Sequence, residues 1–269
     1  IGRLRDKPGF DTLGQAMSGL LSLLSDTNDP KVMGMAVSDY VTGLSAAYGI
    51  LAALMAREKS GVGCRVETSL LQATLSFIGE TAAGYLRTGN VPNRMARVKN
   101  AHAFAVVCKD GRPLAIHCSV PEKFWLALLK AADRMDIGAD ERFKDRDARR
   151  RNYEALEQTL TPTFQEKPRH EWLEILQAGD VPAAALNSVA EVLDDPQVKH
   201  LGLIEKLEHP KAGELQFVGG PVRFENLAQE RSAPPPMLGE HSDKLLQELG
   251  HSAAAISDLR TRGITRTVR

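Results

Sequence analysis

A single acidic residue, Asp39, stands at the start of a long run of apolar and small residues that ends near Lys59. Two kinds of chemistry are open to it. As a helix N-cap, its carboxylate would accept hydrogen bonds from free backbone N–H groups, and the helix dipole would favour its charge. As a nucleophile held at the same place, it would stay ionised and attack an activated acyl group once water is excluded. The pattern alone favours the cap, because Asp caps are common and aspartyl nucleophiles are rare.

Other segments of the chain carry weaker chemical signals. The stretch DKPGFD places a cation, Lys7, close to a second carboxylate, Asp11, although alone it indicates only a turn. The histidines and cysteines are dispersed without metal-binding spacing, so we expect no metal site. Neither GxSxG nor a phosphate-binding glycine motif is present. The basic run RDARRRN (residues 146–152) is best interpreted as a solvated helix face.

The composition excludes several classes of partner. The 269 residues contain 34 Lys and Arg against 34 Asp and Glu, so no overall field attracts nucleic acid or an anionic membrane. We find no secretory signal, and we expect no apolar run long enough to span a bilayer. Cys64, Cys108 and Cys118 lack CxxC spacing, which favours buried free thiols in a reducing compartment and a cytoplasmic location.

The elements that would position Asp39 alternate between helix and strand. Apolar residues recur at helical spacing over residues 40–59, and Gly61 follows as a stop signal. The segment CRVETSL (64–70) predicts a short strand, and a second helix should end at Gly89. Helix, strand and helix joined by small-residue turns are typical of α/β architecture.

A separate small α+β domain is predicted over residues 101–190. Asp110-Gly111 between two apolar stretches predicts a β-hairpin with a type I′ turn. Helices and a strand around residues 180–188 follow, and Ser188 with Glu191 forms a predicted capping box. Residues 191–269 form a linker and a C-terminal return segment with short strands and two helices. Residues 1–100 are then the C-terminal part of the first segment of a large α/β domain.

Taken together, these segments resemble the class III CoA-transferase family, which includes formyl-CoA transferase, carnitine CoA-transferase and α-methylacyl-CoA racemase. The resemblance runs in family order from near residue 2 to near residue 264. The matching stretches are KPGFDTLGQAMSGLLS, SDYVTGLSAAYGILAALMAREKSGVGCRVETSLLQA, KDGRPLAIHC, ERFKDRDARRRNYEALEQTL, DVPAAALNSVAEVLDDPQV and LGEHSDKLLQELGHS. It implies a Rossmann-like large domain, partial here, a second and smaller α+β domain, and an interlocked homodimer.

The resemblance also implies a function for Asp39. In the transferases of the family an aspartate at this position is the nucleophile, which forms a mixed anhydride with the acyl group and then an aspartyl-CoA thioester. The substrates would be an acyl-CoA and a carboxylic acid, with coenzyme A as part of a substrate and no tightly bound cofactor. Lys7, Phe10 and Asp11 match the stretch beside CoA and inherit a binding or supporting role.

Two departures from the family pattern keep alternatives open. The chain lacks the N-terminal Rossmann-like segment of roughly a hundred residues or more that supplies much of the CoA site. It also lacks the glycine-rich loop of formyl-CoA transferase between residues 88 and 104, which argues against an oxalate/formate substrate pair. The alternatives are an α-methylacyl-CoA racemase-like isomerase, in which the aspartate works as an acid or base, and an inactive truncated family member. The sequence does not identify the acyl donor or acceptor.

Overall fold

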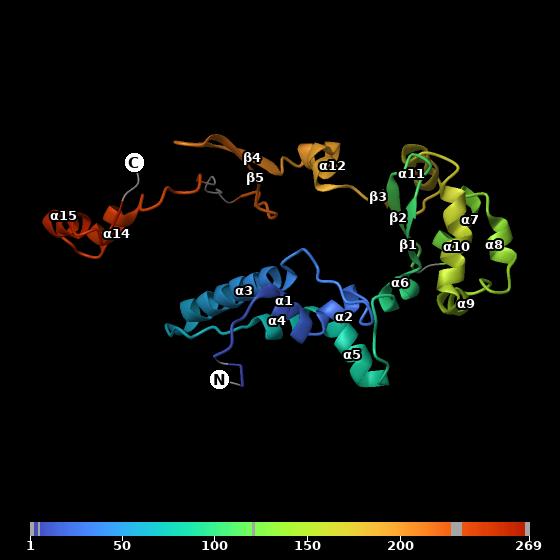
Figure 1. Cartoon of the computed structure of the whole chain (residues 1–269), viewed down its shortest axis with the longest axis horizontal. Coiled ribbons are helices and arrows are strands. Elements are labelled where there is room, and N and C mark those ends of the chain that lie inside the picture. The colour runs from blue at the N-terminus through green and yellow to red at the C-terminus, as the bar shows by residue number, and fades with distance from the viewer. Residues whose placement is uncertain (1–2, 5, 120–121, 227–232, 267–269) are drawn as a thin grey trace. The chain divides into compact units, whose positions relative to one another are not determined.

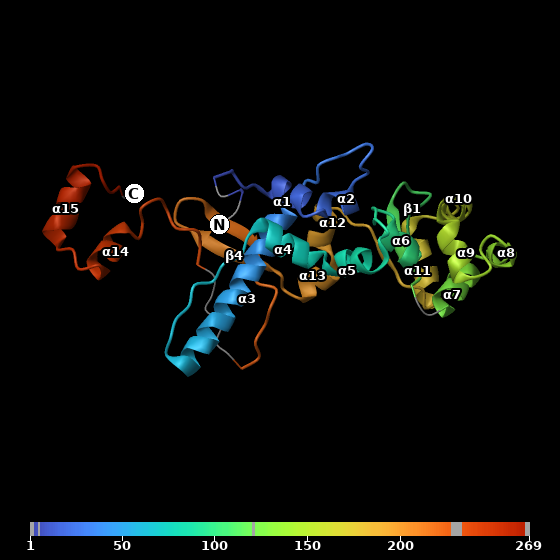
Figure 2. The ribbon, with the colours of Figure 1, turned by 90° about the horizontal axis from the view of Figure 1, so that it is seen from below.

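A computed structural model describes residues 3–4, 6–119, 122–226 and 233–266 (Figures 1 and 2). The chain divides into two compact units, residues 1–186 and residues 187–269. The described residues combine helices with antiparallel sheets, which confirms the mixed α/β class. The finer division at residues 100 and 190 stays a prediction.

The regular elements that the structure describes in the first hundred residues are all helices, joined by irregular segments. Their helices are α1 (Asp11–Met17), α2 (Leu20–Leu24), α3 (Val37–Ser60), α4 (Leu70–Phe77), α5 (Gly79–Thr88) and α6 (Ala96–Ala101). Helices α1, α3 and α4 pack against one another, as Figure 1 shows. The predicted helix ends are confirmed, because Gly61 and Gly89 adopt positive φ as C-caps. The strand predicted at residues 64–70 is wrong: within the described residues this segment has no ladder partner and precedes α4 as irregular chain.

Helix α3 is long and strongly apolar. By length and composition it passes the test for a membrane-crossing helix, which corrects the expectation that no run reaches that length. The same test is passed by core helices of soluble proteins. Gly49 permits a close approach to this helix, because an added Cβ atom would lie 3.1 Å from Val66 Cγ1.

The rest of the first unit is a three-stranded sheet covered by helices. The strands pair antiparallel in the order β1 (Ala103–Val107), β2 (Pro113–His117) and β3 (Ala183–Ala185). The helices are α7 (Lys123–Ala131), α8 (Met135–Ala139), α9 (Arg146–Arg151), α10 (Tyr153–Phe164) and α11 (Arg169–Ala178). One sheet face points its larger residues, including Phe104, Leu114 and Ile116, into a continuous core. That alternation is expected of an antiparallel sheet with one buried face.

A buried arginine anchors this core. Arg149, from the run predicted to be a solvated face, is 1% exposed. Its Nη2 donates to both carboxylate oxygens of Glu122, at 2.8 and 2.7 Å, and its guanidinium lies over the Trp125 ring. The Glu122 carboxylate and the Phe143 carbonyl pair with the two Nη atoms and compensate for burial of the charge, whereas Nε has no hydrogen-bond partner among the described residues. The solvated-face prediction is therefore wrong for Arg149.

The predicted hairpin between β1 and β2 is confirmed, but its turn differs from the prediction. Gly111 has φ +74°, whereas Asp110 does not have the positive φ that a type I′ turn requires at its first central residue. Hydrogen bonds from Gly111 N to Cys108 O and from Cys108 N to Arg112 O close a loop with three residues between Cys108 and Arg112. A three-residue loop with glycine in the left-handed region is the G1-bulge form of hairpin.

The second unit contains two helix pairs and one hairpin. Its elements are α12 (Val189–Asp194), α13 (Pro196–His200), β4 (Ile204–His209), β5 (Gly213–Val218), α14 (Ser242–Glu248) and α15 (Ala253–Thr261). The capping box of Ser188 and Glu191 is confirmed, since each side chain accepts a hydrogen bond from the other residue's backbone N–H.

Candidate functional site

The amino end of α3 does not use Asp39 as its cap. The helix begins at Val37, three residues earlier than the periodicity predicts, and its N-cap residue Ala36 has no capping side chain. Asp39 is therefore the third residue of the first turn. The N-cap interpretation of Asp39 is wrong, because the helix has already started when the chain reaches it.

A carboxylate from another helix caps α3 instead. Asp11, the first residue of α1, accepts hydrogen bonds at Oδ1 from Ser38 N at 2.8 Å and from Asp39 N at 3.3 Å. These are two of the backbone donors that a helix leaves unsatisfied at its amino end. The helix dipole favours the negative charge at this place. Asp11 thus performs for α3 the role that sequence analysis considered for Asp39.

Gln15 holds Asp11 in this position. Its Nε2 donates to Asp11 Oδ2 at 2.6 Å and to Met35 O at 2.9 Å. The side chain is 1% exposed, and its Oε1 has no hydrogen-bond partner among the described residues. Because the buried Gln15 amide donates to both Asp11 and the Met35 carbonyl, it fixes the Asp11 rotamer and the loop that leads into α3.

Close packing brings the three helices together around Ser38. The Ser38 side chain is fully buried and accepts a hydrogen bond from Thr74 Oγ1 on α4 at 2.9 Å. A Cβ atom at Gly14 on α1 would lie 3.0 Å from both Leu70 Cβ and Ser38 Cβ. Glycine at position 14 is therefore what permits α1 to lie against the amino end of α3.

The carboxylate of Asp39 itself is exposed. Within the described part of the chain it accepts no hydrogen bond and forms no ion pair. A carboxylate with both oxygens unoccupied, at the positive end of a helix, has the properties of an available nucleophile.

The other residues predicted for the site lie on the segment before α1. Lys7 and Phe10 are exposed, with Phe10 at the N-cap position of α1. The Lys7 side chain forms no ion pair within the described residues. The structure thus joins Asp11 to the backbone of Asp39 and leaves Lys7 and Phe10 free at the surface.

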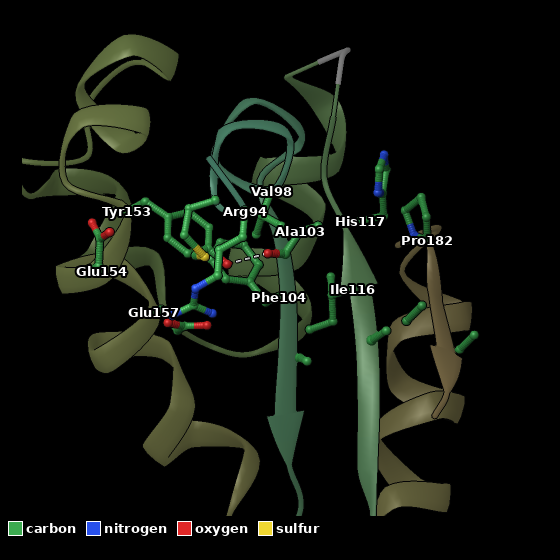
Figure 3. A pocket seen from close by; sticks show the side chains of 15 residues that line it. Arg94, Val98, Ala103, Phe104, Ile116, His117, Tyr153, Glu154, Glu157 and Pro182 are labelled. Atoms are coloured by element: carbon green, nitrogen blue, oxygen red, sulfur yellow. Dashed lines mark hydrogen bonds between the residues drawn. The ribbon is translucent and has the colours of Figure 1, made fainter. Parts of the chain in front are cut away.

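A separate pocket of about 890 Å³ opens on the sheet of the small domain (Figure 3). Its floor is formed by small side chains, with Ala105, Ala115 and Ala184 paired side by side across the three strands. Tyr153 donates a hydrogen bond to Ala103 O at one wall, and Arg94 points toward Glu157. The sequence does not predict this pocket, because its lining residues come from segments that are far apart in the chain.

Two buried groups of the small domain are held in their neutral forms. Burial lowers the pKa of His102, with smaller contributions from the nearby Arg149 and Arg146 guanidinium groups. Burial also raises the pKa of the Cys118 thiol to about 12, so this cysteine is inert rather than nucleophilic. Cys108 is buried as predicted, whereas Cys64 is exposed. A search of the described residues finds no group of side chains arranged to hold a metal ion.

Comparison with known proteins agrees with the resemblance noted in the sequence. The model of CoA-transferase family III matches residues 1–242. Human succinyl-CoA:glutarate CoA-transferase is 29% identical over 269 residues, covering 98% of this chain and 60% of that protein. Acetyl-CoA:oxalate CoA-transferase from Acetobacter aceti is 29% identical, covering 92% of this chain and 63% of that protein.

Solved structures share the fold. A CAIB/BAIF family protein from Brucella suis superposes with a TM-score of 0.78 at 27% identity, covering 93% of this chain and 65% of that one. A Mycobacterium tuberculosis protein gives a TM-score of 0.75 at 24% identity, covering 90% of this chain and 65% of that one. The chain thus spans about 60% of the length of the human and mouse succinyl-CoA:glutarate CoA-transferases. It belongs to CoA-transferase family III.

Proposed function

We propose that the protein transfers coenzyme A between an acyl-CoA thioester and a carboxylic acid, with Asp39 as the nucleophile. The observation that supports this proposal is that Asp11, and not Asp39, caps the amino end of α3. Asp11 satisfies the backbone donors of Ser38 and Asp39, so the Asp39 carboxylate is left exposed and uncommitted. Membership of a family whose named relatives are CoA-transferases supports the same reaction.

The reaction follows from covalent catalysis by a carboxylate. An Asp39 oxygen attacks the thioester carbon of the donor, the C–S bond breaks, and CoA leaves as a thiolate from a mixed anhydride. The thiolate then attacks the aspartyl carbonyl, which releases the donor acid as a carboxylate and leaves an aspartyl-CoA thioester.

The acceptor acid reverses these two steps. Its carboxylate attacks the aspartyl thioester and expels the CoA thiolate, forming a second anhydride. The thiolate attacks the acceptor's acyl carbon, and the new acyl-CoA leaves with the Asp39 carboxylate restored. No electrons are transferred and no proton is consumed, so no further cofactor is required.

Lys7 and Phe10 are proposed to contact coenzyme A. Both are exposed on the segment that leads into α1, whose first residue caps the helix carrying Asp39. An ammonium group suits the phosphates of CoA, and an aromatic ring suits its apolar or adenine parts. Succinyl-CoA and glutarate are the first substrate pair to test, because the human relative carries that name.

The assembly is proposed to be a homodimer in the cytoplasm. On α3 the side chains of Tyr40, Leu44, Tyr48, Leu51 and Met55 are each more than 60% exposed in the single chain. Apolar surface of this extent on one helix is normally covered by other protein. Light scattering on the full-length protein checks the dimer, and a monomeric mass would contradict it.

The experiment that tests the function uses the full-length protein with succinyl-CoA. Rapid quenching during turnover should show an adduct of the mass of CoA, which peptide mapping assigns to the peptide containing Asp39. Asp39→Asn should fold normally and lose transfer by several orders of magnitude, because a neutral amide is a poor nucleophile. An Asn variant that keeps full activity would contradict the proposal.

The same protein distinguishes the racemase alternative. An isomerase that uses Asp39 as an acid or base would give no adduct in any variant. It would instead exchange the α-proton of a 2-methylacyl-CoA with deuterated solvent, and Asp39→Asn would slow that exchange. An inactive family member would show neither reaction.

A further inference from the structure

We infer that Asp11 is a positioning residue for Asp39: it supplies the cap of α3 from a different helix and thereby leaves the Asp39 carboxylate free to react. The inference rests on the proposed role of Asp39 as nucleophile. It assigns Asp11 a function distinct from the CoA contact that the family resemblance implies.

All backbone donors in the first turn of α3 are accounted for without the Asp39 side chain. Val37 N donates to Met35 O at 2.9 Å, and Tyr40 N donates to Ala36 O at 3.1 Å as the first regular helical bond. The two donors between them, Ser38 N and Asp39 N, both reach Asp11 Oδ1. Two of the free donors at the amino end are therefore satisfied by a residue that lies 28 positions before Asp39, and the third is satisfied by Met35 O.

Removing the Asp11 carboxylate would leave Ser38 N and Asp39 N without an acceptor, and the Asp39 carboxylate lies in the same turn and could replace it. Short acidic side chains in the first turn readily accept hydrogen bonds from nearby backbone N–H groups. Asp39 would then be drawn toward its own helix end, and the lone pairs needed for attack would be engaged in capping. Asp11 prevents this because its Oδ1 already accepts the hydrogen bonds of Ser38 N and Asp39 N.

The geometry of Asp11 distinguishes positioning from substrate binding. Oδ1 accepts from two backbone donors and Oδ2 accepts from Gln15 Nε2, so both oxygens are already engaged within the protein. Gln15 is almost wholly buried and is fixed in turn by Met35 O. A carboxylate held in this way is committed to the structure of α3 rather than to a ligand.

The test compares Asp11→Ala with Asp11→Asn in the full-length protein, using succinyl-CoA and glutarate. Asp11→Ala should lower kcat by about 10–100-fold, and KM for succinyl-CoA should change by less than about threefold, because the Asp39 carboxylate becomes less available for attack while no contact with CoA is lost. Asp11→Asn keeps an oxygen that can cap Ser38 N and Asp39 N, but it turns an amide NH2 toward the Gln15 Nε2 donor, so it should recover only part of the kcat that Asp11→Ala loses. The rate of adduct formation at Asp39 in a single turnover should follow kcat.

A matched control removes the side-chain cap of a different helix, α9, to measure the effect of lost stability alone. Asp145 caps α9 through a 2.7 Å hydrogen bond from Ala148 N, so Asp145→Ala loses a comparable cap without touching α3. It should lose a similar amount of stability and keep the parent kcat. If Asp145→Ala lowers kcat as much as Asp11→Ala, the effect is general destabilisation and the inference is wrong.

Gln15→Met keeps the test decisive if Asp11→Ala does not fold. The substitution preserves the size of the side chain and leaves the Asp11 carboxylate in place without its orienting donor. It should lower kcat by about 3–10-fold with KM unchanged, since Asp11 would populate other rotamers. A Gln15→Met enzyme with the parent kcat would overturn the inference.

The remaining outcomes separate this inference from the proposed function. If Asp11→Ala raises KM and leaves kcat unchanged, Asp11 is a CoA contact. If Asp11→Asn is as inactive as Asp11→Ala, capping of α3 does not account for the role of Asp11 and the inference is wrong. If Asp39→Asn is inactive while Asp11→Ala is fully active, Asp39 keeps its role and only the positioning role of Asp11 fails.

Discussion

The helices before residue 102 and the small domain after it are stabilised in different ways. The continuous apolar core consists of residues between Phe104 and Val181, all in the small domain. Within the described helices that precede it, the buried apolar side chains are Leu20, Ala73 and Ala101. The helical region is organised instead by the Asp11, Gln15 and Ser38 contacts and by close approach at glycine.

This contrast separates stability from the proposed chemistry. The three-stranded sheet and the helices that cover it bury a continuous apolar core, which stabilises this region. The helical region carries the candidate nucleophile and leaves much of α3 exposed in the single chain. Substitutions of the same type should therefore change stability by different amounts in the two regions, which provides a direct way to test the difference.

The largest expected effect on stability comes from truncating the core. Leu128 on α7 is fully buried, so Leu128→Ala should cost about 3 kcal/mol through lost transfer energy and a residual cavity. Leu44 on α3 is 69% exposed, so Leu44→Ala in the 269-residue chain should cost less than about 0.5 kcal/mol. Urea denaturation measures both. Equal decreases in the free energy of unfolding would mean that Leu44 is buried in solution and that the two regions do not differ as described.

A pair of glycines provides the next test, within the helical region itself. Gly14→Ala would press a methyl group against Leu70 Cβ and Ser38 Cβ, and should cost about 2 kcal/mol by overpacking. Gly43, in the middle of α3, has no atom within 4 Å of an added Cβ, so Gly43→Ala should stabilise by about 0.5–1 kcal/mol. Thermal denaturation should shift in opposite directions. A neutral Gly14→Ala would show that α1 does not pack closely on α3.

Substitution of Gly111 in the hairpin of the small domain should change stability by a smaller amount, through backbone conformation alone. At Gly111 an added Cβ meets no atom within 4 Å, but its φ of +74° is unfavourable for any side chain. Gly111→Val should therefore cost about 1–2 kcal/mol. Gly63 also has open space and lies in loop without a positive φ, so Gly63→Val is the matched control and should be close to neutral. Equal melting temperatures for the two variants would refute the left-handed turn.

Much of this architecture is predictable because its signals are local. Gly61 and Gly89 end helices, Asp110-Gly111 marks a hairpin, and Ser188 with Glu191 caps a helix, each through contacts a few residues apart. Asp39 is also found from the sequence, first as an acid before an apolar run and then through the family resemblance.

The contacts that define the site are not predictable in the same way, because they join distant residues. Nothing local indicates that Asp11 reaches the amino end of α3, since α3 starts before its apolar periodicity does. The sequence predicts Arg149 to be part of a solvated basic run, because its partner Glu122 lies 27 residues away in the chain. The extended segment at residues 64–70 has strand-forming composition, but strand formation requires a neighbouring strand that the described residues do not provide.

The smallest expected effect is a pH dependence that belongs to the small domain alone. Burial is the main reason that the pKa of His102 falls below 6.5, the charges of Arg149 and Arg146 lower it further, and a hydrogen bond with the Arg146 backbone and the charge of Glu122 oppose the shift. The unfolded chain therefore binds a proton at His102 more readily than the folded protein does. The stabilisation from neutral His102 is complete above pH 6.5 and is lost as the pH falls toward the lowered pKa, with a slope of at most about 1.4 kcal/mol per pH unit.

His102→Asn isolates this contribution. His102 has φ +43°, and Asn tolerates this left-handed conformation better than most residues, so the variant should keep the backbone between α6 and β1. Urea denaturation of both proteins between pH 5 and 8 should give similar stabilities at pH 8 and a shallower decline for the variant below pH 6.5. Carboxylates that titrate near pH 5 affect both proteins equally, so the difference between the two curves reports His102. Parallel curves would show that His102 is as accessible to protons in the folded protein as in the unfolded chain, and that the core of the small domain does not exclude them.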